Sequence, residues 1–399
     1  MSPVSARMRQ LARPNPVWLA VIAALVLTTI GIMAIGTVEP YYALKQGRQW
    51  LPIAIMVMLG CILPHPRAIG LAAYPMLVGI LLLLVYMVIP GAPLVPRING
   101  ATSWLDLPFM RVQPAEVAKV IFVLSMAWYL RYRSSYRSML GLVVPFVIML
   151  IPVALILKQP DLGTAVLFAP TLFIMLVAAG AKLRHLGALV GLALAVVAIN
   201  IAIIYVLPDH MQVLKPHQRT RVTSMISLAF GDKSDLDTDA YHQDVAMRLI
   251  GAGGMSGYGY EQSRTLIRLN HLPHDHNDSI FVVIVNRWGL LGAWTVIGMY
   301  LVLFGSMLAV ASRSKDPFAR LACVGFGAMI FVQATINIGM FINLLPVTGI
   351  TLPFVSYGGS SLLVTFAMVG LVVNFATRRP VMLSRPSFEF DNKADAIFE

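Results

Sequence analysis

Acidic side chains beside long apolar runs are the residues of this sequence that could do chemistry. The chain has only 18 acidic residues among 399, and an ionisable group next to a membrane-length apolar run is costly to keep. The segment LNHLPHDHNDSIF places Asp278 directly before such a run. Partial desolvation there would raise the proton affinity of the carboxylate, which suits a general base. The alternative role, capping of the helix that follows, is compatible with catalysis.

The same segment is dense in histidine. It carries His271, His274 and His276 together with Asp275. Imidazole nitrogens and carboxylate oxygens bind divalent ions, so Mg or Mn is the cofactor that this segment could use. The local spacing matches no established ligand pattern, and we therefore predict no metal site built by the protein itself.

Three further charged residues lie at the ends of apolar runs. Glu116 and Lys119 are three residues apart, so they share one face of a helix and can pair. This spacing is as compatible with a structural ion pair as with a functional one. Asp161, in KQPDLGTA, precedes an apolar run, and we interpret it first as a helix cap that accepts amide hydrogens.

Two other patterns could bind an anion. The glycine-rich run GAGGMSGYGY, Gly251 to Tyr260, could let backbone amides approach a phosphate, although tight turns explain its glycines more simply. A set of basic residues on or near one face would suit an anionic lipid headgroup or a diphosphate, with a solvated loop surface as the alternative. They are Arg48, Arg111, Lys158, Lys215, Arg219, Arg221, Arg264 and Arg268.

Membrane helices must position these residues. Hydrophobic residues make up 58% of the chain and charged residues 12%, which is about half the charged share of a soluble domain. Apolar runs of about 20 residues cross a bilayer as helices. The predicted fold is all-α, a polytopic membrane protein with about ten transmembrane helices and a long extracytoplasmic loop between helices 7 and 8. The expected spans are Val17–Gly36, Leu51–Leu63, Leu71–Val88, Glu116–Leu130, Leu140–Leu157, Gly163–Gly180, Leu186–Val206, Ile280–Leu303, Ala322–Phe341 and Ser360–Phe375.

The net charge of +12 has a membrane explanation. Basic residues fall mostly in short loops between apolar runs, as the excess of Lys and Arg in cytoplasmic loops predicts, so we expect membrane lipids and no nucleic acid as partners. The same bias places both termini in the cytoplasm. We predict one membrane domain, residues 1–380, which contains the outer loop 208–279, and a short cytoplasmic tail, 381–399. Cys61 and Cys323 fall in apolar runs and are expected to be packing residues.

Several stretches, taken in order, resemble one family. The stretch NIGMFINLLPVTGITLPFVSYGGSS, Asn337 to Ser361, is similar to the signature of the SEDS family, the RodA/FtsW/SpoVE proteins. The stretches SWLDLPFMRVQPAEVAK, QPDLGTA, LKPHQRTRV, GAGGMSGYG and LPHDHNDSIF resemble further family motifs in the family's order. The resemblance covers nearly the whole chain, and LKPHQ is more similar to the RodA branch than to the FtsW branch.

The resemblance implies a peptidoglycan glycosyltransferase of the bacterial cytoplasmic membrane. Such an enzyme polymerises lipid II, an undecaprenyl-diphosphate-linked disaccharide peptide, into glycan strands at the outer face during elongation or division. The implied protein partner is a class B penicillin-binding protein. The family's essential aspartate maps to Asp278, and the residues that we expect to bind substrate are Arg48, Glu116, Lys119, Asp161, Arg219 and Ser356.

The sequence departs from the family pattern at four places near this site. His274 stands where the family has Glu, Ser279 where it has Phe, Asn286-Arg287 where it has a Glu pair, and Val245 where it often has Gln. The Asn286-Arg287 pair keeps a divergent, inactive scaffold for a penicillin-binding protein as an alternative. A transporter or flippase for polyprenyl-linked sugars is the other alternative, because charged residues inside the membrane are compatible with a transporter, which keeps its key polar groups near the bilayer midplane. Most candidate residues here cluster toward the outer face, which favours an enzyme.

Overall fold

The structure is a computed structural model that describes residues 15–97, 101–108, 110–206, 238–272, 276–346 and 348–378. Within these residues the chain is mostly helical. A short hairpin, β1 (Leu105–Asp106) antiparallel to β2 (Arg111–Val112), interrupts the helices, with Leu105 opposite Val112. The fold is therefore all-α, as the sequence predicts.

Each of the ten expected apolar runs coincides with helical structure. The segments are α2 (Val17–Val38); α3 (Pro40–Lys45) with a π-helical turn η1 (Gln46–Trp50) and α4 (Leu51–Ile62); α5 (Pro66–Val88); α6 (Pro114–Leu130); α7 (Val143–Lys158) after two 3-10 turns, η2 (Ser135–Arg137) and η3 (Leu140–Leu142); α8 (Leu162–Val166) with α9 (Phe168–Ala179); α10 (Leu183–Val206); α14 (Ile280–Arg313); α15 (Pro317–Phe341); and α16 (Gly359–Thr377). Among the described residues, seven helical segments are long and apolar enough to cross a membrane. The chain is a polytopic membrane protein, and a total of about ten spans stays a prediction.

The second segment begins earlier than its apolar pattern predicts. The expected start was Leu51, but helical structure starts at Pro40. Gln46 is fully buried in this extension, and its side chain donates to Ser356 O at 3.1 Å and accepts from Gly358 N at 3.4 Å. A buried polar contact with a distant loop thus helps to hold these turns, in addition to the packing of Ala43 in the core.

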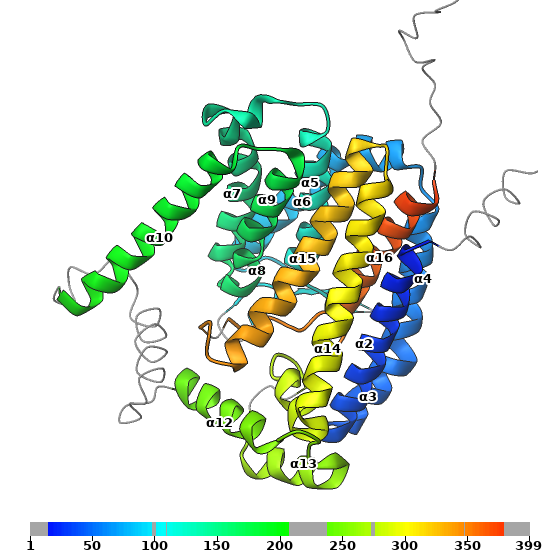
Figure 1. Ribbon diagram of the computed structural model, residues 1–399, viewed down its shortest axis with the longest axis vertical. Coiled ribbons are helices and arrows are strands. Elements are labelled where there is room, and N and C mark those ends of the chain that lie inside the picture. Colours follow the sequence, from blue (N-terminus) through cyan, green and yellow to red (C-terminus); the bar gives the residue numbers. More distant parts are fainter. Residues whose placement is uncertain are drawn as a thin grey trace, which may run out of the picture.

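Helix α15 is the central helix of the bundle. Of the seven apolar segments it is the most enclosed, with 83% of its window buried against 28% for α5. It packs against α6, α9, α14 and α16, and Figure 1 shows it between the green and the yellow helices. Helix α10 instead projects away from the bundle (Figure 1), and its exposed leucines present an apolar surface that suits lipid. A side chain on α15 can therefore contact several elements at once.

Two shorter helices, α12 (Thr238–Ala252) and α13 (Gly259–Leu269), lie within the predicted outer loop at one end of the bundle (Figure 1). The glycine-rich run between them packs directly against α14. A Cβ atom at Gly257 would lie 2.3 Å from Arg287 O, and one at Gly289 would lie 2.4 Å from Met255 O. Both glycines have positive φ, 75° and 66°. Tight turns and close backbone approach account for these glycines, and no phosphate is needed to explain them.

The unusual Asn286-Arg287 pair stabilises the same contact. Asn286 is fully buried and donates from Nδ2 to Leu249 O at 2.9 Å. The Arg287 guanidinium donates to Met33 O at 2.6 Å and to Thr37 Oγ1 at 2.8 Å, both on α2. The two residues therefore join α12, α14 and α2, which gives this departure from the family pattern a structural role.

Candidate functional site

A cleft of about 1190 Å³ lies where four segments meet. The segments are the α3–η1–α4 junction, the β1–β2 hairpin, the turn before α14 and the loop before α16. Its basic lining residues are Lys45, Arg48 and Arg111, and Arg111 also pairs with Asp106 at 2.6 Å. Arg48 therefore lies in this cleft, and its role in binding an anionic group stays a prediction.

Aromatic rings line the same cleft. Trp50, Trp104 and Tyr357 lie among the basic residues, together with Tyr41. A pocket with mostly apolar and aromatic walls and a few charged groups is typical of a small-molecule site. Cations bind diphosphates through charge-assisted hydrogen bonds, and rings offer apolar faces to a sugar or a lipid. The lining therefore fits a diphosphate-linked sugar.

Asp278 lies beside this cleft. Its chain neighbour Asn277 lines the wall, and α14 begins two residues later at Ile280 with Ser279 at the N-cap position. The Asp278 carbonyl accepts from Asn337 Nδ2 at 2.9 Å. A Cβ atom at Gly349 would lie 3.5 Å from Asp278 Oδ2, so the half-buried carboxylate lies over the backbone of Gly349.

A cluster of three rings joins the walls around Asp278. The His276 ring stacks on Tyr42 of α3, with centroids 4.7 Å apart and planes at 17°. Tyr42 also contacts the Tyr357 ring at 4.7 Å, and Tyr357 N donates to His276 O at 2.9 Å. The turn that carries Asp278 is thereby fixed to α3 and to the loop before α16. His276 acts here through packing and through its backbone.

A divalent cation has no evident donor set in the described part of the chain. No three His, Cys, Asp or Glu side chains gather there to hold a metal ion. His271 is exposed with φ 47°, while His274 and Asp275 lie outside the described residues. A requirement for Mg or Mn stays a prediction, and no step proposed below uses a metal.

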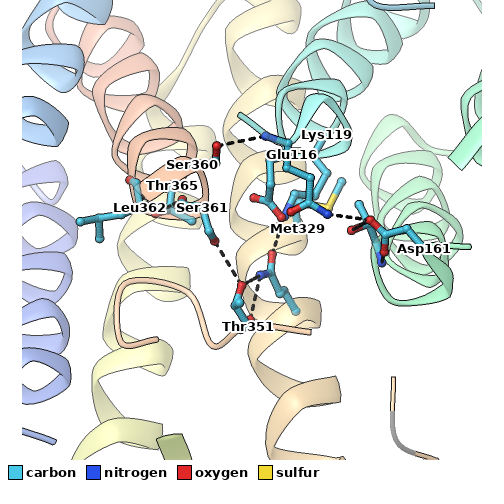
Figure 2. A network of polar contacts seen from close by, with 12 residues as sticks. Glu116, Lys119, Asp161, Met329, Thr351, Ser360, Ser361, Leu362 and Thr365 are labelled. Carbon is cyan, nitrogen blue, oxygen red and sulfur yellow. Dashed lines mark hydrogen bonds and ion pairs between the residues drawn. The ribbon is translucent and has the colours of Figure 1, made fainter. Parts of the chain in front are cut away.

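The expected Glu116–Lys119 pair is confirmed. Lys119 Nζ lies 2.8 Å from Glu116 Oε1, and the Lys119 side chain is 0% exposed. The same ammonium donates to Gln333 Oε1 on α15 at 2.8 Å. Gln333 Nε2 donates in turn to Thr351 O at 2.9 Å, and Figure 2 shows the contact that continues from Thr351 to Ser361. Glu116 Oε2 is buried without a hydrogen-bond partner among the described residues, so Lys119 supplies the main compensation for this carboxylate.

Two of the expected substrate-binding residues have structural contacts. Asp161 caps α8, as predicted: Oδ1 accepts from Thr164 N at 2.9 Å, and Oδ2 accepts from Gln113 Nε2 at 2.7 Å. Ser356 is buried, and its hydroxyl accepts from Leu352 N at 2.7 Å, so it stabilises the loop before α16. Arg219 lies outside the described residues.

Gln333 and Asn337, which were not predicted from the sequence, link these sites. Both are almost fully buried in α15 and contact Lys119 and Asp278 respectively. Their signal was present: two amide side chains four residues apart share one face of an apolar helix. A polar pair of this kind inside a membrane span is unusual enough to be a candidate functional feature.

A family model matches residues 16–380, that of the FtsW/RodA/SpoVE cell cycle proteins. The chain belongs to this family. It is 32% identical over 364 residues to the peptidoglycan glycosyltransferase MrdB of Escherichia coli K12, covering 91% of this chain and 92% of MrdB. It is also 32% identical over 309 residues to a probable peptidoglycan glycosyltransferase FtsW of Geobacter metallireducens, covering 77% of each chain.

Solved structures agree with this assignment. A chain from a peptidoglycan synthase complex, described for its coordination of polymerization and crosslinking, superposes with a TM-score of 0.75 at 28% identity, covering 91% of this chain and 98% of that chain. The rod shape determining protein RodA of Thermus thermophilus gives a TM-score of 0.64 at 26% identity, covering 91% of this chain and 97% of RodA. The sequence comparisons and the structural comparisons thus indicate the same family and the same fold.

The buried pair yields a test that separates stability from activity. Glu116→Ala should lower the melting temperature more than Glu116→Gln, because Gln keeps an amide oxygen that can accept from the buried ammonium, whereas Ala leaves no acceptor at this position, a loss of about 3–5 kcal/mol for a broken buried pair. The double change Glu116→Leu, Lys119→Met should recover the melting temperature, since a buried pair can be replaced by apolar residues. It should not recover activity, because Gln333 then loses its donor. Full recovery of both properties would show that the pair is only structural.

Proposed function

We propose that this chain polymerises lipid II into glycan strands at the outer face of the cytoplasmic membrane, with Asp278 as the general base. Its function as a peptidoglycan glycosyltransferase follows from its family and its named relatives. The observation that carries the finer proposal is the meeting of an aspartate with a basic, aromatic cleft. The wall residue Asn277 directly precedes Asp278, and Arg48 and Lys45 lie in the same cleft.

The reaction needs few groups. Lipid II carries its sugar on a diphosphate, which is already a good leaving group, and the acceptor is a sugar hydroxyl. Asp278 takes the proton from the acceptor hydroxyl, whose oxygen attacks the anomeric carbon of the donor. The bond from that carbon to the diphosphate oxygen breaks, and undecaprenyl diphosphate leaves with the electron pair. One glycosidic bond forms and one glycosyl–phosphate bond is lost.

Basic residues at the cleft support departure of the diphosphate. Charge that develops on the leaving oxygens is stabilised by preorganised cations, which act more strongly in a site that excludes water. Lys45, Arg48 and Arg111 are the described residues placed to do this. Lys119 is unsuitable for direct contact, because it is fully enclosed by Glu116 and Gln333. Lys119 therefore supports the structure of the site and does not bind substrate directly.

The burial of Lys119 also weakens the transporter alternative. A transporter of polyprenyl-linked sugars would expose its key polar groups near the bilayer midplane to each side in turn. Here the intramembrane Glu116–Lys119 pair is closed off within the bundle, while the basic residues gather at the cleft. The inactive-scaffold alternative rested on Asn286-Arg287, and those residues have the structural role described above.

The proposed protein partner is a class B penicillin-binding protein. The similar chain in a solved structure belongs to a peptidoglycan synthase complex in which polymerization and crosslinking are coordinated. A polymerase of uncrosslinked strands needs such a crosslinking enzyme at the same membrane face. We propose that this chain makes the glycan strands and that the penicillin-binding protein crosslinks them.

Orientation gives one prediction. If both termini are cytoplasmic, α13 is outside the cell, so a single cysteine at the exposed Gln262 should react with an impermeant maleimide added to intact cells. The background protein has Cys61 and Cys323 replaced by Ala. A cysteine at Arg133, in the predicted cytoplasmic loop after α6, should react only after the membrane is permeabilised. The reverse labelling pattern would contradict the proposed topology.

Asp278→Asn gives the main test of the mechanism. Loss of a general base commonly lowers the rate by about 10²–10⁴-fold, so the purified variant should form no visible strands from labelled lipid II on a gel. Its membrane insertion and its binding to the penicillin-binding protein should be unchanged. Asp316→Asn is the matched control, because Asp316 caps α15 by accepting from Phe318 N at 3.1 Å. Normal strand synthesis by the Asp278→Asn protein would contradict the assignment.

A further inference from the structure

We propose that Gln333 and Asn337 of α15 are positioning residues that connect the buried Glu116–Lys119 pair to Asp278. The inference rests on the proposed function of Asp278 as the base. Two amide side chains, one helical turn apart, hold the two ends of the site to one short loop. The loop is Gly349–Thr351, which lies between α15 and α16.

Asn337 holds Asp278 and the loop together. Its side chain is fully buried, and its Nδ2 group donates to Asp278 O at 2.9 Å and to Ile350 O at 2.6 Å. One amide group therefore fixes the distance between the turn that carries the base and the loop beneath it. The Asp278 carboxylate also lies close to Gly349 of this loop, so a shift of the loop relative to α14 would change the surroundings of the carboxylate.

Gln333 connects the same loop to Lys119. Its Oε1 atom accepts from Lys119 Nζ at 2.8 Å, and its Nε2 group donates to Thr351 O at 2.9 Å. An amide has one acceptor end and one donor end. The ammonium can only donate, so it requires the oxygen of Gln333 to face it and the nitrogen to face the loop. Lys119 thereby sets the orientation of Gln333, and Glu116 holds Lys119 in place.

The resulting chain of contacts runs from Glu116 through Lys119 and Gln333 to the loop, and from the loop through Asn337 to Asp278. Figure 2 shows its first part, where α6, α15 and the loop at Thr351 converge. Neither amide needs to touch substrate for this effect. A misplacement of the base by about 1 Å can lower the rate by about 10²-fold, so loss of either amide should reduce turnover while substrate binding at the cleft persists.

The alternative is that these amides only hold helices together. Asn374 of α16 is a matched control for that role. It is also fully buried, and its Nδ2 group also donates to two backbone carbonyls, Cys61 O and Pro64 O, each at 2.8 Å. These contacts lie at the opposite end of the bundle from the start of α14 (Figure 1). Asn374→Ala therefore removes an equivalent pair of side-chain to backbone hydrogen bonds, and it does so far from Asp278.

The experiment measures kcat, KM and melting temperature for strand synthesis from lipid II by the purified proteins. Asn337→Ala should lower kcat by at least about tenfold with KM changed less than about threefold, since a displaced base slows chemistry more than binding. Asn374→Ala should lower the melting temperature by a similar amount and leave kcat nearly unchanged. Gln333→Glu is the second variant, for use if Asn337→Ala fails to fold. It keeps the acceptor for Lys119 but loses the amide donor to the loop, so it should show the same loss of kcat.

A double-mutant cycle tests the connection itself. Lys119→Met combined with Asn337→Ala should lower kcat little more than the larger single effect, because both changes break one chain of contacts. Lys119→Met combined with Asn374→Ala should show independent effects. If the fold-losses of kcat caused by Lys119→Met and Asn337→Ala multiply in the double variant, or if Asn337→Ala leaves kcat unchanged as Asn374→Ala does, the positioning role is wrong.

Asp278→Asn, measured in the same assay, separates the two proposals. Normal polymerisation by Asp278→Asn would contradict the assignment of the base. An inactive Asp278→Asn protein, together with fold-losses that multiply, would overturn the positioning role alone.

Discussion

The fully buried ammonium of Lys119 is the constraint on which the rest of the site depends. A charge removed from water is stable only with close, well-directed partners, and Lys119 finds them on two helices: Glu116 on its own α6 and Gln333 on α15. Those partners fix the position of α6 against the central helix. They also fix the side of Gln333 that faces the loop before α16, and through that loop they reach the turn that carries Asp278.

Close backbone packing holds the first part of α14, which continues from that turn. The glycines between α12 and α13 lie against the kink of α14 at Gly289, and Asn286 and Arg287 join this region to α12 and α2. On the other side, the His276 ring stacks on Tyr42. The turn before α14 is therefore held from two directions, and the basic cleft forms where α3 and the β1–β2 hairpin meet it. A carboxylate held beside a basic cleft is the arrangement that we propose for glycosyl transfer from a diphosphate.

Local patterns in the sequence predicted the parts of this account that depend on neighbouring residues. Apolar runs located the long apolar helices but not α12 and α13, the three-residue spacing predicted the Glu116–Lys119 pair, and the position of Asp161 predicted its cap. Contacts between distant segments could not be predicted in this way. Gln46 stabilises the extension of the second helical segment through a partner that lies 310 residues away in the sequence. The hydroxyl of Ser356 accepts a hydrogen bond inside its own loop. The roles of Gln333 and Asn337 likewise depend on which segments α15 meets.

An experimental structure of the protein with a non-reactive lipid II analogue and an acceptor sugar tests the central claim most directly. The account predicts the diphosphate against Arg48 and Lys45 in the cleft. It also predicts the acceptor hydroxyl within about 2.6–3.2 Å of the Asp278 carboxylate, the distance that proton transfer requires. A diphosphate bound inside the bundle at Glu116 and Lys119, with the sugar far from Asp278, would contradict the account and favour transport.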